Sequence, residues 1–363
     1  MGYNARIMRK TKSKILVAMS GGVDSSVAAA LLVRAGFDVT GMYAVNYDEP
    51  TTDGKNCWRG DYQDALRVAA KLGIKLLRWN FVKEYRRDVL DYMYREYNAG
   101  RTPNPDVLCN KFVKFGAWLD RAKKEGYDFI ATGHYGQTKN GKLLCAEDNN
   151  KDQTYFLHQL SGEQLKCSMF PLGQYTKPQV RALAKKFDLP TAAKEESMGI
   201  CFVGELDMKE FLQRDLKKNP GKIVTESGEI IGEHEGLAFY TIGQRHIGVQ
   251  SSQFGIRSDN KPLFVVAKHF DANELVVGYE DSELLNKQEI EVEDINWISG
   301  QIPKFPLKCT VRLRHRQALQ EVIIEKNGEV YNLKFLIKQR AATPGQFAVF
   351  YKDGECLGGG VIL

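Results

Sequence analysis

The 363-residue sequence has no run of about twenty uncharged apolar residues, the length of helix that crosses a bilayer, so no membrane association is expected. It also has no apolar stretch behind its basic start, which argues against a secretory signal. The first 14 residues contain five cations and no acid: Arg6, Arg9, Lys10, Lys12 and Lys14. We favour a basic tail over the alternative, a short organellar transit peptide.

The cysteines include no C-x-x-C pair, and no Cys/His group has the spacing of a zinc finger. Structural zinc and iron–sulfur clusters are therefore not expected, and no metal-ligating set is predicted. The cysteines are odd in number and dispersed in a large chain without a secretory signal, which predicts reduced thiols and a cytoplasmic location. They are Cys57, Cys109, Cys145, Cys167, Cys201, Cys309 and Cys356.

The chain lacks internal repeats and low-complexity segments, and its length predicts two or three domains. A hydrophobic content of 43% is enough to give each domain a core. The 51 Lys and Arg exceed the 45 Asp and Glu by six, a mild surplus that is compatible with a polyanionic partner. Charge alone identifies no such partner, so function has to be sought in the motifs.

Residues 14–135 alternate apolar, strand-like runs with amphipathic stretches. A buried strand at 15–19, a helix at 25–35 and a strand at 39–46 form a βαβ unit. The alternation continues with helices near 62–72, 84–97 and 110–124 and with strands near 76–81 and 129–132. This order predicts an α/β domain with a doubly wound parallel sheet, which we place at residues 1–208.

After about residue 205 the pattern changes to short strands separated by turn residues. Strands at 223–225, 264–267 and 275–277 predict a small, mostly β middle domain at residues 209–285. Strands at 308–313, 321–325, 330–335 and 346–351, followed by three glycines at 358–360, predict a C-terminal β-barrel at residues 286–363.

The string S-G-G-V-D-S-S begins at Ser20, directly after the first expected strand and at the start of the next helix. Two glycines let the backbone approach an anion, while hydroxyls and the helix N-terminus supply donors and partial positive charge. No Gly-Lys-Ser/Thr ends the string, so it is not a Walker A loop. We interpret it as a phosphate-binding loop rather than as an ordinary glycine-rich turn.

Two cysteines occur in unusual contexts. Cys109 follows the Pro-stiffened stretch R-T-P-N-P-D and precedes a helical pattern, which places it near a helix N-terminus with Lys111 close by, where a thiolate is favoured. Asp106 is a candidate base or substrate-positioning group. Cys201 lies between glycines in S-M-G-I-C-F-V-G, a sequence that permits a tight, accessible loop.

The chemistry of these two residues supports a reactive thiol and a small core residue equally well. For Cys145, Cys167, Cys309 and Cys356 we favour the core interpretation. For Cys57, in a polar stretch, metal, thiol and core interpretations all remain open.

The loop at Ser20 resembles the signature of the PP-loop ATP pyrophosphatases, which adenylate a substrate oxygen and release pyrophosphate. With further strings, the chain from about Lys14 onward resembles the bacterial and organellar tRNA-specific 2-thiouridylases. These strings are G-R-T-P-N-P-D-V-L-C-N-K at Gly100, A-T-G-H-Y at Ala131, N-K-D-Q-T-Y-F-L at Asn150, G-I-C-F at Gly199, G-Q-R at Gly243, T-P-G-Q at Thr343 and C-L-G-G-G at Cys356.

The resemblance implies a role for each matching residue. The ATP site would comprise Ala18, Met19, Ser20, Gly21, Gly22, Val23, Asp24 and Ser25, with Ala44 and Gly133 lining the adenosine and Asp24 organising Mg²⁺ and phosphate. The target base would face Asn104, Pro105 and Asp106. Cys109 would be the nucleophile and Cys201 the persulfide carrier. Other tRNA contacts would be His134, Lys151, Asp152, Gln153, Arg314, His315 and Gln346.

The implied reaction is ATP-dependent 2-thiolation of the wobble uridine in tRNA of the Lys, Glu and Gln type. Sulfur would come from an external donor, a cysteine desulfurase or a sulfur-relay protein. The chain departs from the family pattern at Met198, Leu206 and His315, where a small hydroxyl residue, Arg and Tyr are usual. The alternatives are another PP-loop adenylating enzyme or a non-catalytic tRNA-binding sulfur-relay protein, and intact Cys109 and Cys201 argue against both.

Overall fold

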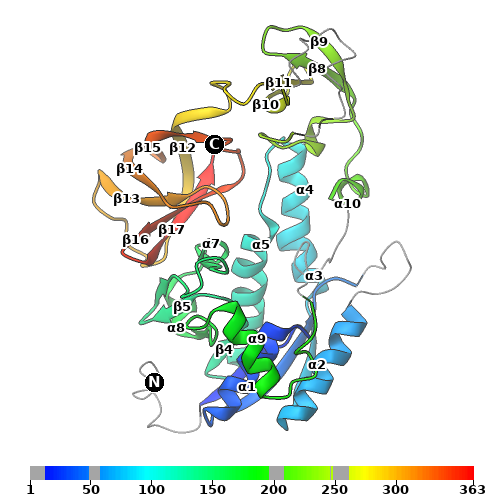
Figure 1. Ribbon diagram of the computed structural model, residues 1–363, viewed down its shortest axis with the longest axis vertical. Helices are drawn as coiled ribbons and strands as arrows, with labels where there is room; N and C mark the ends of the chain where they lie inside the picture. The colour runs from blue at the N-terminus through cyan, green and yellow to red at the C-terminus, as the bar shows by residue number, and fades with distance from the viewer. Residues whose placement is uncertain (1–12, 49–57, 196–207, 246, 248–260) are drawn as a thin grey trace.

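The computed structural model describes residues 13–48, 58–195, 208–245, 247 and 261–363. None of the helices in these ranges is long and apolar enough to cross a membrane. Figure 1 shows the first domain below, with the middle domain and the barrel on either side of the upper end of helix α4 (Asp91–Asn98).

The first domain is built on a five-stranded parallel sheet, which confirms the expected doubly wound α/β fold. Its order is β3-β2-β1-β4-β7, and Ile15, Leu16 and Val17 of the central strand are fully buried because helices cover both faces. The strands are β1 Lys14–Ala18, β2 Asp38–Val45, β3 Leu76–Asn80, β4 Phe129–Ala131 and β7 Ser168–Met169.

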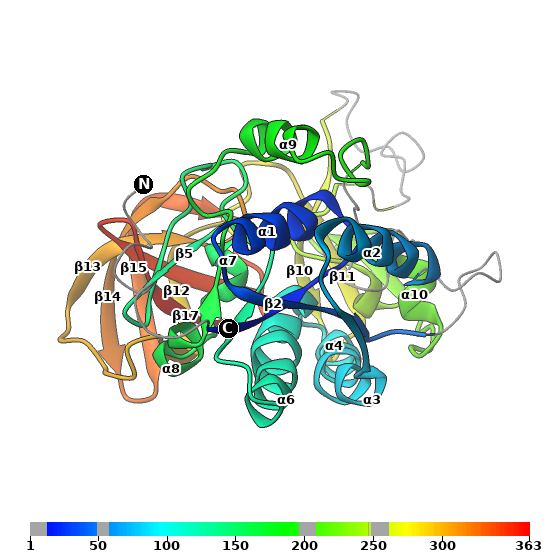
Figure 2. The same cartoon turned by 90° about the horizontal axis from the view of Figure 1, so that it is seen from below.

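Helices cover the two faces of this sheet in two layers, as Figure 2 shows. One layer contains α1 (Val23–Arg34), α2 (Trp58–Leu72) and α9 (Lys177–Lys186). The other contains a helical run of α3 (Val82–Tyr85), a π-helical turn at Arg86–Leu90 and α4, and a second run of α5 (Pro105–Leu108), a π-helical segment at Cys109–Trp118 and α6 (Leu119–Lys124).

The middle domain is a four-stranded sheet in the order β10-β11-β8-β9. Its core includes Ile223, Ile231, Val265 and Leu275, all fully buried. The elements are α10 Met208–Gln213, β8 Gly221–Thr225, β9 Ile230–His234, a 3₁₀ turn at Leu237–Phe239, β10 Phe264–His269 and β11 Glu274–Gly278.

The C-terminal strands form an antiparallel barrel in the order β12-β15-β14-β13-β16-β17, which β12 and β17 close by pairing with each other. This confirms the expected barrel. The strands are β12 Asn286–Trp297, β13 Leu307–Arg312, β14 Gln320–Asn327, β15 Val330–Arg340, β16 Phe347–Lys352 and β17 Glu355–Ile362.

A hairpin from the first domain also joins the barrel, which the sequence pattern did not indicate. Strand β6 (Lys142–Leu144) pairs with β17 and with β5 (Gln137–Lys139), so the sheet runs on from the barrel into the first domain. Two short helices follow, α7 (Thr154–Leu157) and α8 (Gly162–Lys166). The barrel and the first domain therefore share backbone hydrogen bonds as well as side-chain packing.

Candidate active site

The glycine-rich loop connects β1 to α1, where the sequence predicted it. Gly21 has φ +76°, and a Cβ at this position would lie 2.2 Å from the backbone oxygen of Asp61 in α2. Both facts restrict the position to glycine. The loop is thus held against α2, and its shape does not tolerate a side chain at its tip.

Serine hydroxyls brace the loop from within. Ser25 Oγ accepts a hydrogen bond from the Ser20 backbone amide at 3.2 Å and donates one to the Gly22 carbonyl at 3.1 Å. Ser26 Oγ donates to the same carbonyl at 2.7 Å. In the part of the chain that the structure describes, no side chain caps the N-terminus of α1, whose N-cap residue is Gly22. The first turn of α1 therefore keeps its donors for a ligand that approaches the loop.

The loop after β4 lies directly against the same helix end. A Cβ on Gly133 would lie 2.8 Å from the Ser25 backbone nitrogen and 2.9 Å from the Asp24 carbonyl carbon. In the strand order, β1 and β4 flank the point where the chain reverses its direction of travel across the sheet. Nucleotides bind at such switch points, beyond the carboxyl ends of the strands. Ala44, near the end of neighbouring β2, is 8% exposed.

The carboxylate of Asp24 contacts two side chains that the sequence analysis did not predict for the site. Lys177 Nζ, at the start of α9, lies 2.7 and 2.8 Å from the two carboxylate oxygens, and the Tyr135 hydroxyl donates to Oδ1 at 3.0 Å. Tyr135 stands in the A-T-G-H-Y string, which was a usable signal. Lys177 is 153 residues from Asp24 and carried no local signal. The structure thus adds a cation beside the expected phosphate site.

A second lysine neutralises acids on the α2 side of the loop. Lys194 Nζ lies 2.7 Å from carboxylate oxygens of both Asp61 and Asp64. Burial works against the ammonium, but the two carboxylates prevail and raise the pKa of Lys194 above its usual value. Positive charges from the segment after β7 thus flank the glycine-rich loop on both sides.

The stretch that carries Cys109 begins its helix earlier than the sequence suggested. Asn104 is the N-cap, with its side-chain oxygen accepting from the Val107 amide at 3.3 Å, and Pro105 occupies the first helical turn. Cys109 is consequently inside a continuous helical run and starts its π-helical segment. The helix thus begins about one turn before its predicted start near residue 110, because Asn104 and Pro105 together start it.

The Cys109 side chain is fully buried, whereas Asp106, one turn earlier, is half-buried. A helix dipole acts mainly within the first turn, which contains Asp106, so it favours negative charge at Asp106 and helps the Cys109 thiolate little. π-Helical segments inside α-helices occur often at functional sites. The two predicted catalytic groups therefore share one helix and differ in their access to solvent.

The barrel supports the stretch before this helix. Gln346 Nε2 donates to the carbonyl oxygens of Thr102 at 2.9 Å and Pro103 at 3.2 Å, and its Oε1 accepts from Asn104 Nδ2 at 3.4 Å. The Thr102 amide donates to the Pro344 carbonyl at 2.8 Å. The structure therefore brings Asn104 and Gln346, two expected tRNA contacts, together from opposite ends of the chain.

The middle domain supports the same stretch from its other side. Lys268 Nζ, at the end of β10, donates to the Gly100 carbonyl at 3.1 Å, and the ring of Phe270 covers Gly100. The Thr102 and Thr241 hydroxyls lie 3.3 Å apart. We call residues 100–106 the junction loop, because all three domains meet on it.

The expected tRNA contacts at 151–153 form part of another buried cluster. The Asp152 side chain is almost fully buried and accepts from Arg312 Nη1 at 2.8 Å and from the Thr154 hydroxyl at 2.8 Å. His315 contacts the Asp152 carbonyl at 3.1 Å. Gln153 Oε1 accepts from the Tyr135 amide at 2.9 Å. Asp152 thus joins the first domain to the barrel, and its carboxylate is directed away from solvent.

His134 and Arg314 are placed differently from one another. His134 Nδ1 lies 2.8 Å from the Thr132 hydroxyl, and burial together with nearby Lys114 holds the pKa of His134 well below its usual value. The imidazole is therefore neutral at pH 7. Arg314 Nη2 donates to the Ala341 carbonyl at 2.7 Å within the barrel. His134 follows β4 and Gly133, so it borders the nucleotide loop rather than the barrel.

The other cysteines fall into two groups. Cys57 and Cys201 lie outside the described residues, as do Met198 and Leu206. Cys145 and Cys356 pack with the main core, and Cys309 packs against the barrel core. Burial raises the pKa of the Cys145 thiol to about 11 and that of Cys309 to about 12. These thiols stay protonated at pH 7, as small core residues do.

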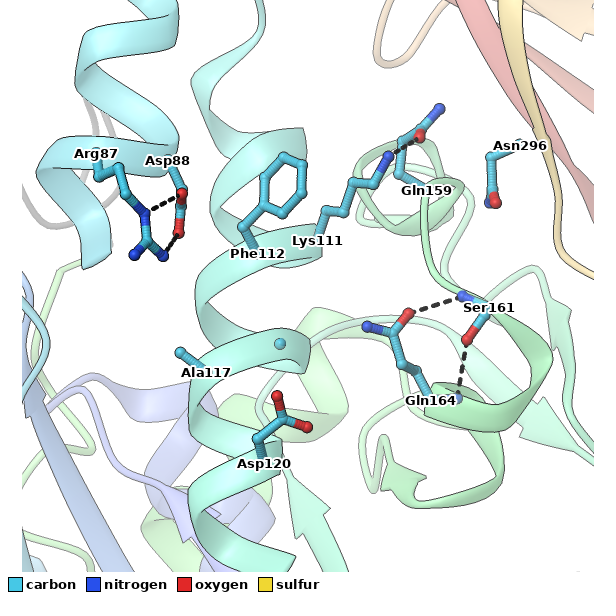
Figure 3. Close-up of a pocket in the computed structure, with 11 residues that line it drawn as sticks. Arg87, Asp88, Lys111, Phe112, Ala117, Asp120, Gln159, Ser161, Gln164 and Asn296 are labelled. Atoms are coloured by element: carbon cyan, nitrogen blue, oxygen red, sulfur yellow. Dashed lines mark hydrogen bonds and ion pairs between the residues drawn. The ribbon is translucent and has the colours of Figure 1, made fainter.

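A groove of about 510 Å³ lies elsewhere on the first domain, between the Cys109–Trp118 segment, α8 and the start of the barrel (Figure 3). Lys111 Nζ donates to Gln159 Oε1 at 2.9 Å across it, and Arg87 pairs with Asp88 on its far wall. None of the residues predicted for the ATP, sulfur or tRNA sites lines this groove. We therefore place the candidate active site at the two loops and not in this groove.

No three His, Cys, Asp or Glu side chains gather closely enough to hold a metal ion in the part of the chain that the structure describes. Asp24 is a single carboxylate beside a phosphate loop. Mg²⁺ is commonly bound by one or two carboxylates together with substrate phosphates, so this arrangement fits a metal that arrives with a nucleotide.

Comparison with known proteins matches the three domains to three family models. Residues 13–205 match the tRNA methyl transferase HUP domain, residues 209–279 the tRNA methyl transferase PRC-barrel domain and residues 287–362 the aminomethyltransferase beta-barrel domain. The chain is 45% identical over 361 residues to the tRNA-specific 2-thiouridylase MnmA of Streptococcus sanguinis (strain SK36), covering 97% of this chain and 95% of that protein.

Solved structures show weaker likenesses. An NMN synthetase from Francisella tularensis has a TM-score of 0.33 at 18% identity, covering 53% of this chain and 68% of that one. A 4-thiouridine synthetase–RNA complex with bound ATP has a TM-score of 0.34 at 15% identity, covering 56% of this chain and 50% of that one. At these values neither structure decides the fold or the chemistry of this chain.

Proposed function

The chain belongs to the tRNA-specific 2-thiouridylase family, and we propose from this premise that it replaces the C2 oxygen of the wobble uridine of tRNA with sulfur at the expense of ATP. The observation that carries the proposal is the 45% identity to a curated 2-thiouridylase across 97% of the chain, through all three domains. We assign ATP binding to the glycine-rich loop and presentation of the target uridine to the junction loop.

ATP binds at the loop Ala18–Ser25, with Ala44 and Gly133 lining the adenosine. What supports this is the contact between the β1 and β4 loops at the switch point of the sheet and the uncapped N-terminus of α1. Asp24 would hold Mg²⁺ together with the phosphates, and there the ion would supply charge neutralisation on the phosphates. Lys177, which neutralises Asp24 in this structure, then adds positive charge for the phosphates.

The target uridine lies beside Asn104, Pro105 and Asp106. A base in an anticodon loop is unstacked and presented by its edge, as is usual for RNA read at loops. Further tRNA contacts come from His134, Lys151, Gln153, Arg314, His315 and Gln346. For the Lys151–Gln153 segment we limit the contact to Lys151, Gln153 and the backbone, because the Asp152 carboxylate is buried against Arg312.

The chemistry needs one adenylation and one sulfur transfer. The uridine C2 oxygen attacks the α-phosphate of ATP and releases pyrophosphate, which turns that oxygen into part of an AMP leaving group. An external donor, a cysteine desulfurase or a sulfur-relay protein, loads Cys201 with a persulfide. The terminal persulfide sulfur reaches C2 and displaces AMP.

Two routes balance the electrons of the transfer. Cys109 attacks the persulfide first and releases hydrosulfide, or it attacks the inner sulfur after the terminal sulfur has bonded to C2. Both routes end in a Cys109–Cys201 disulfide, which an external two-electron reductant returns to two thiols. A cytoplasmic location, where thiols are kept reduced, suits this cycle.

Nucleoside mass spectrometry tests the proposal directly. Incubation of the chain with ATP, Mg²⁺, a persulfide donor and unmodified tRNA is expected to yield 2-thiouridine, with AMP and pyrophosphate in equal amounts to it. ADP and phosphate in place of AMP and pyrophosphate would refute adenylation. Sulfur at any position other than C2 of uridine would refute the assigned reaction.

A further inference from the structure

Asn46 is a buried polar residue that has no hydrogen-bond partner among the residues that the structure describes. It follows the last residue of β2, and only 1% of its surface is exposed. Within the described ranges, neither its side-chain oxygen nor its side-chain nitrogen has a partner. Asn110, another buried asparagine of this domain, differs because its Nδ2 donates to the Phe156 carbonyl at 3.0 Å.

An unsatisfied buried amide opposes folding, since both polar atoms lose water and gain nothing in return. A leucine of similar size would avoid this cost at such a position. Groups of this kind persist where a ligand supplies the missing partners, because folding then pre-forms a binding site. Asn46 is therefore a candidate ligand contact on the evidence of its own surroundings.

The sheet places Asn46 beside the glycine-rich loop. The Met19 amide, at the start of that loop, donates to the Met42 carbonyl at 2.8 Å, which shows where β1 ends relative to β2. Strand β2 continues to Val45. At a strand rise of about 3.3 Å per residue, Asn46 therefore lies about 13 Å beyond Met42. Residues 43–46 consequently flank the space above the carboxyl end of β1, where the switch point lies.

We propose that Asn46 reads the adenine edge of ATP and is a specificity-determining residue of the enzyme. The inference rests on the proposed binding of ATP at Ala18–Ser25. In doubly wound nucleotide sites, the residue at the end of the second strand faces the nucleoside, while the first loop holds the phosphates. A carboxamide offers one acceptor and one donor, the pair that matches the N6 amino group of adenine and a neighbouring ring nitrogen.

A uracil edge also presents one donor beside one acceptor, so the position of Asn46 has to decide between the two bases. The loop expected to face the target base, residues 104–106, is supported by Gln346 of the barrel. Asn46 belongs instead to the strand next to the phosphate loop, two residues beyond Ala44, whose methyl group leaves room for a flat ring. Adenine is the base that this placement favours.

Isothermal titration without tRNA tests the assignment on the full chain, with ATP and purine riboside triphosphate as probes. The second nucleotide lacks only the exocyclic amino group. We expect wild type to bind ATP about 10- to 100-fold more tightly than this analogue, the range for one lost hydrogen bond that leaves a buried partner unpaired. Asn46→Leu should bind both nucleotides with equal, weakened affinity.

Asn80→Leu is the matched control. Asn80 stands directly opposite Val45 in the register of β3 and β2, but it is exposed and its Oδ1 already accepts from the Val82 amide at 3.0 Å. It should retain the wild-type preference for ATP. The nucleotide-free Asn46→Leu protein should also melt no lower than wild type, because the substitution removes an unpaired buried amide.

The possible results separate the inference from the proposed function. Wild type that binds neither nucleotide would overturn ATP binding itself. An Asn46→Leu protein that still prefers ATP by the wild-type ratio would overturn only the role of Asn46. Unchanged ATP binding with lost thiolation of tRNA would assign Asn46 to the uridine and overturn the adenine assignment. A lowered melting temperature with an unchanged ratio would show a structural residue.

Discussion

The glycine-rich loop and the junction loop are both short segments next to a helix N-terminus, yet they are held in different ways. The hydroxyls that brace the first come from Ser20 and Ser25 within it and from Ser26 in the adjoining first turn of α1. The second depends on Lys268 and Gln346, which lie 168 and 244 residues away from their partners. Nucleotide binding can therefore be complete in one domain, whereas presentation of the target base requires three docked domains.

The strongest test of this division is the loss of a reactive thiol. Cys109→Ala and Cys201→Ala should each abolish 2-thiouridine formation, because neither sulfur-transfer route proceeds without both sulfurs. ATP binding by Cys109→Ala should stay at the wild-type level, since the hydrogen bonds that brace the glycine-rich loop do not involve the helix of Cys109. Nucleoside mass spectrometry and isothermal titration measure the two properties.

Cys309→Ala serves as the control for thiol loss. Cys309 packs against the barrel core and its thiol pKa is raised to about 12 by burial, so it is unreactive at pH 7. The variant should form 2-thiouridine at the wild-type rate. Residual 2-thiouridine in Cys109→Ala at a tenth of that rate or more would contradict the proposed nucleophile.

The next largest effect is expected for Lys177, which pairs with Asp24 next to the glycine-rich loop. Lys177→Met should weaken ATP binding by about 10-fold, because it removes a cation beside the phosphates and takes from Asp24 the ammonium that neutralises it. Isothermal titration with ATP provides the measurement. Lys71→Met is a matched control, because Lys71 pairs with Asp188 at the exposed surface. Equal affinities in the two variants would remove Lys177 from the site.

Gln346→Ala tests whether the junction loop needs its barrel support. The change removes two hydrogen bonds to the backbone at Thr102 and Pro103, and each is worth about 1 kcal/mol. We expect kcat for thiolation to fall by about 10-fold with ATP affinity unchanged, because Asp106 and Cys109 are less well positioned. Steady-state kinetics with varied tRNA separates this effect from a simple contact, which would raise the KM for tRNA and spare kcat.

Gln301→Ala is the control for the barrel substitution. Gln301 is exposed, and its backbone, not its side chain, makes its hydrogen bonds with Ser299. It should leave both kcat and KM as they are in the wild type. A kcat loss of the same size in Gln301→Ala would show that the effect of Gln346 is not specific to the junction loop.

The smallest predicted effect is a dependence of stability on pH at the middle-domain contact. Burial lowers the pKa of Lys268 from 10.5 to about 8. The unfolded chain therefore binds this proton more tightly, and the free energy of unfolding rises with pH between about 8 and about 10.5. Below pH 8 both states are protonated and the penalty is constant.

Urea denaturation at pH 7.5 and 9.5 measures this dependence. Wild type should gain stability relative to Lys268→Met as the pH rises, because only wild type loses the proton from a buried ammonium. Lys338→Met, whose lysine lies at an exposed ion pair with Glu283, should follow wild type. A difference between wild type and Lys268→Met that does not change with pH would contradict the titration of Lys268.

Local signals were enough to place several elements of the fold. The order of strands and helices in residues 14–135 and the loop at Ser20 follow from hydrophobic period and turn residues, which act over a few positions. The start of the Cys109 helix was also readable, from Asn104 and Pro105, but the hydrophobic pattern alone put it near residue 110. Capping chemistry decided that boundary.

Other features had no local signal, because they arise from contacts between distant segments. The hairpin β5–β6 pairs with the barrel through backbone hydrogen bonds that any sequence of suitable shape can make. The Asp152–Arg312 ion pair converts an expected RNA contact into a link between domains. Asn46 reads in the sequence as an ordinary residue at the end of a strand, and only the structure shows that its amide is buried without a partner among the described residues.

The sequence by itself determined the α/β order of the first domain, the β character of the rest and the phosphate loop, since these depend on neighbours along the chain. Its motifs also indicated the protein family. Only the tertiary structure decided that Lys177 faces Asp24, that Gln346 and Lys268 hold the junction loop, and that Asn46 is buried with no partner in the described part of the chain. These depend on packing between segments more than a hundred residues apart or on exclusion of water, which local periodicity does not encode.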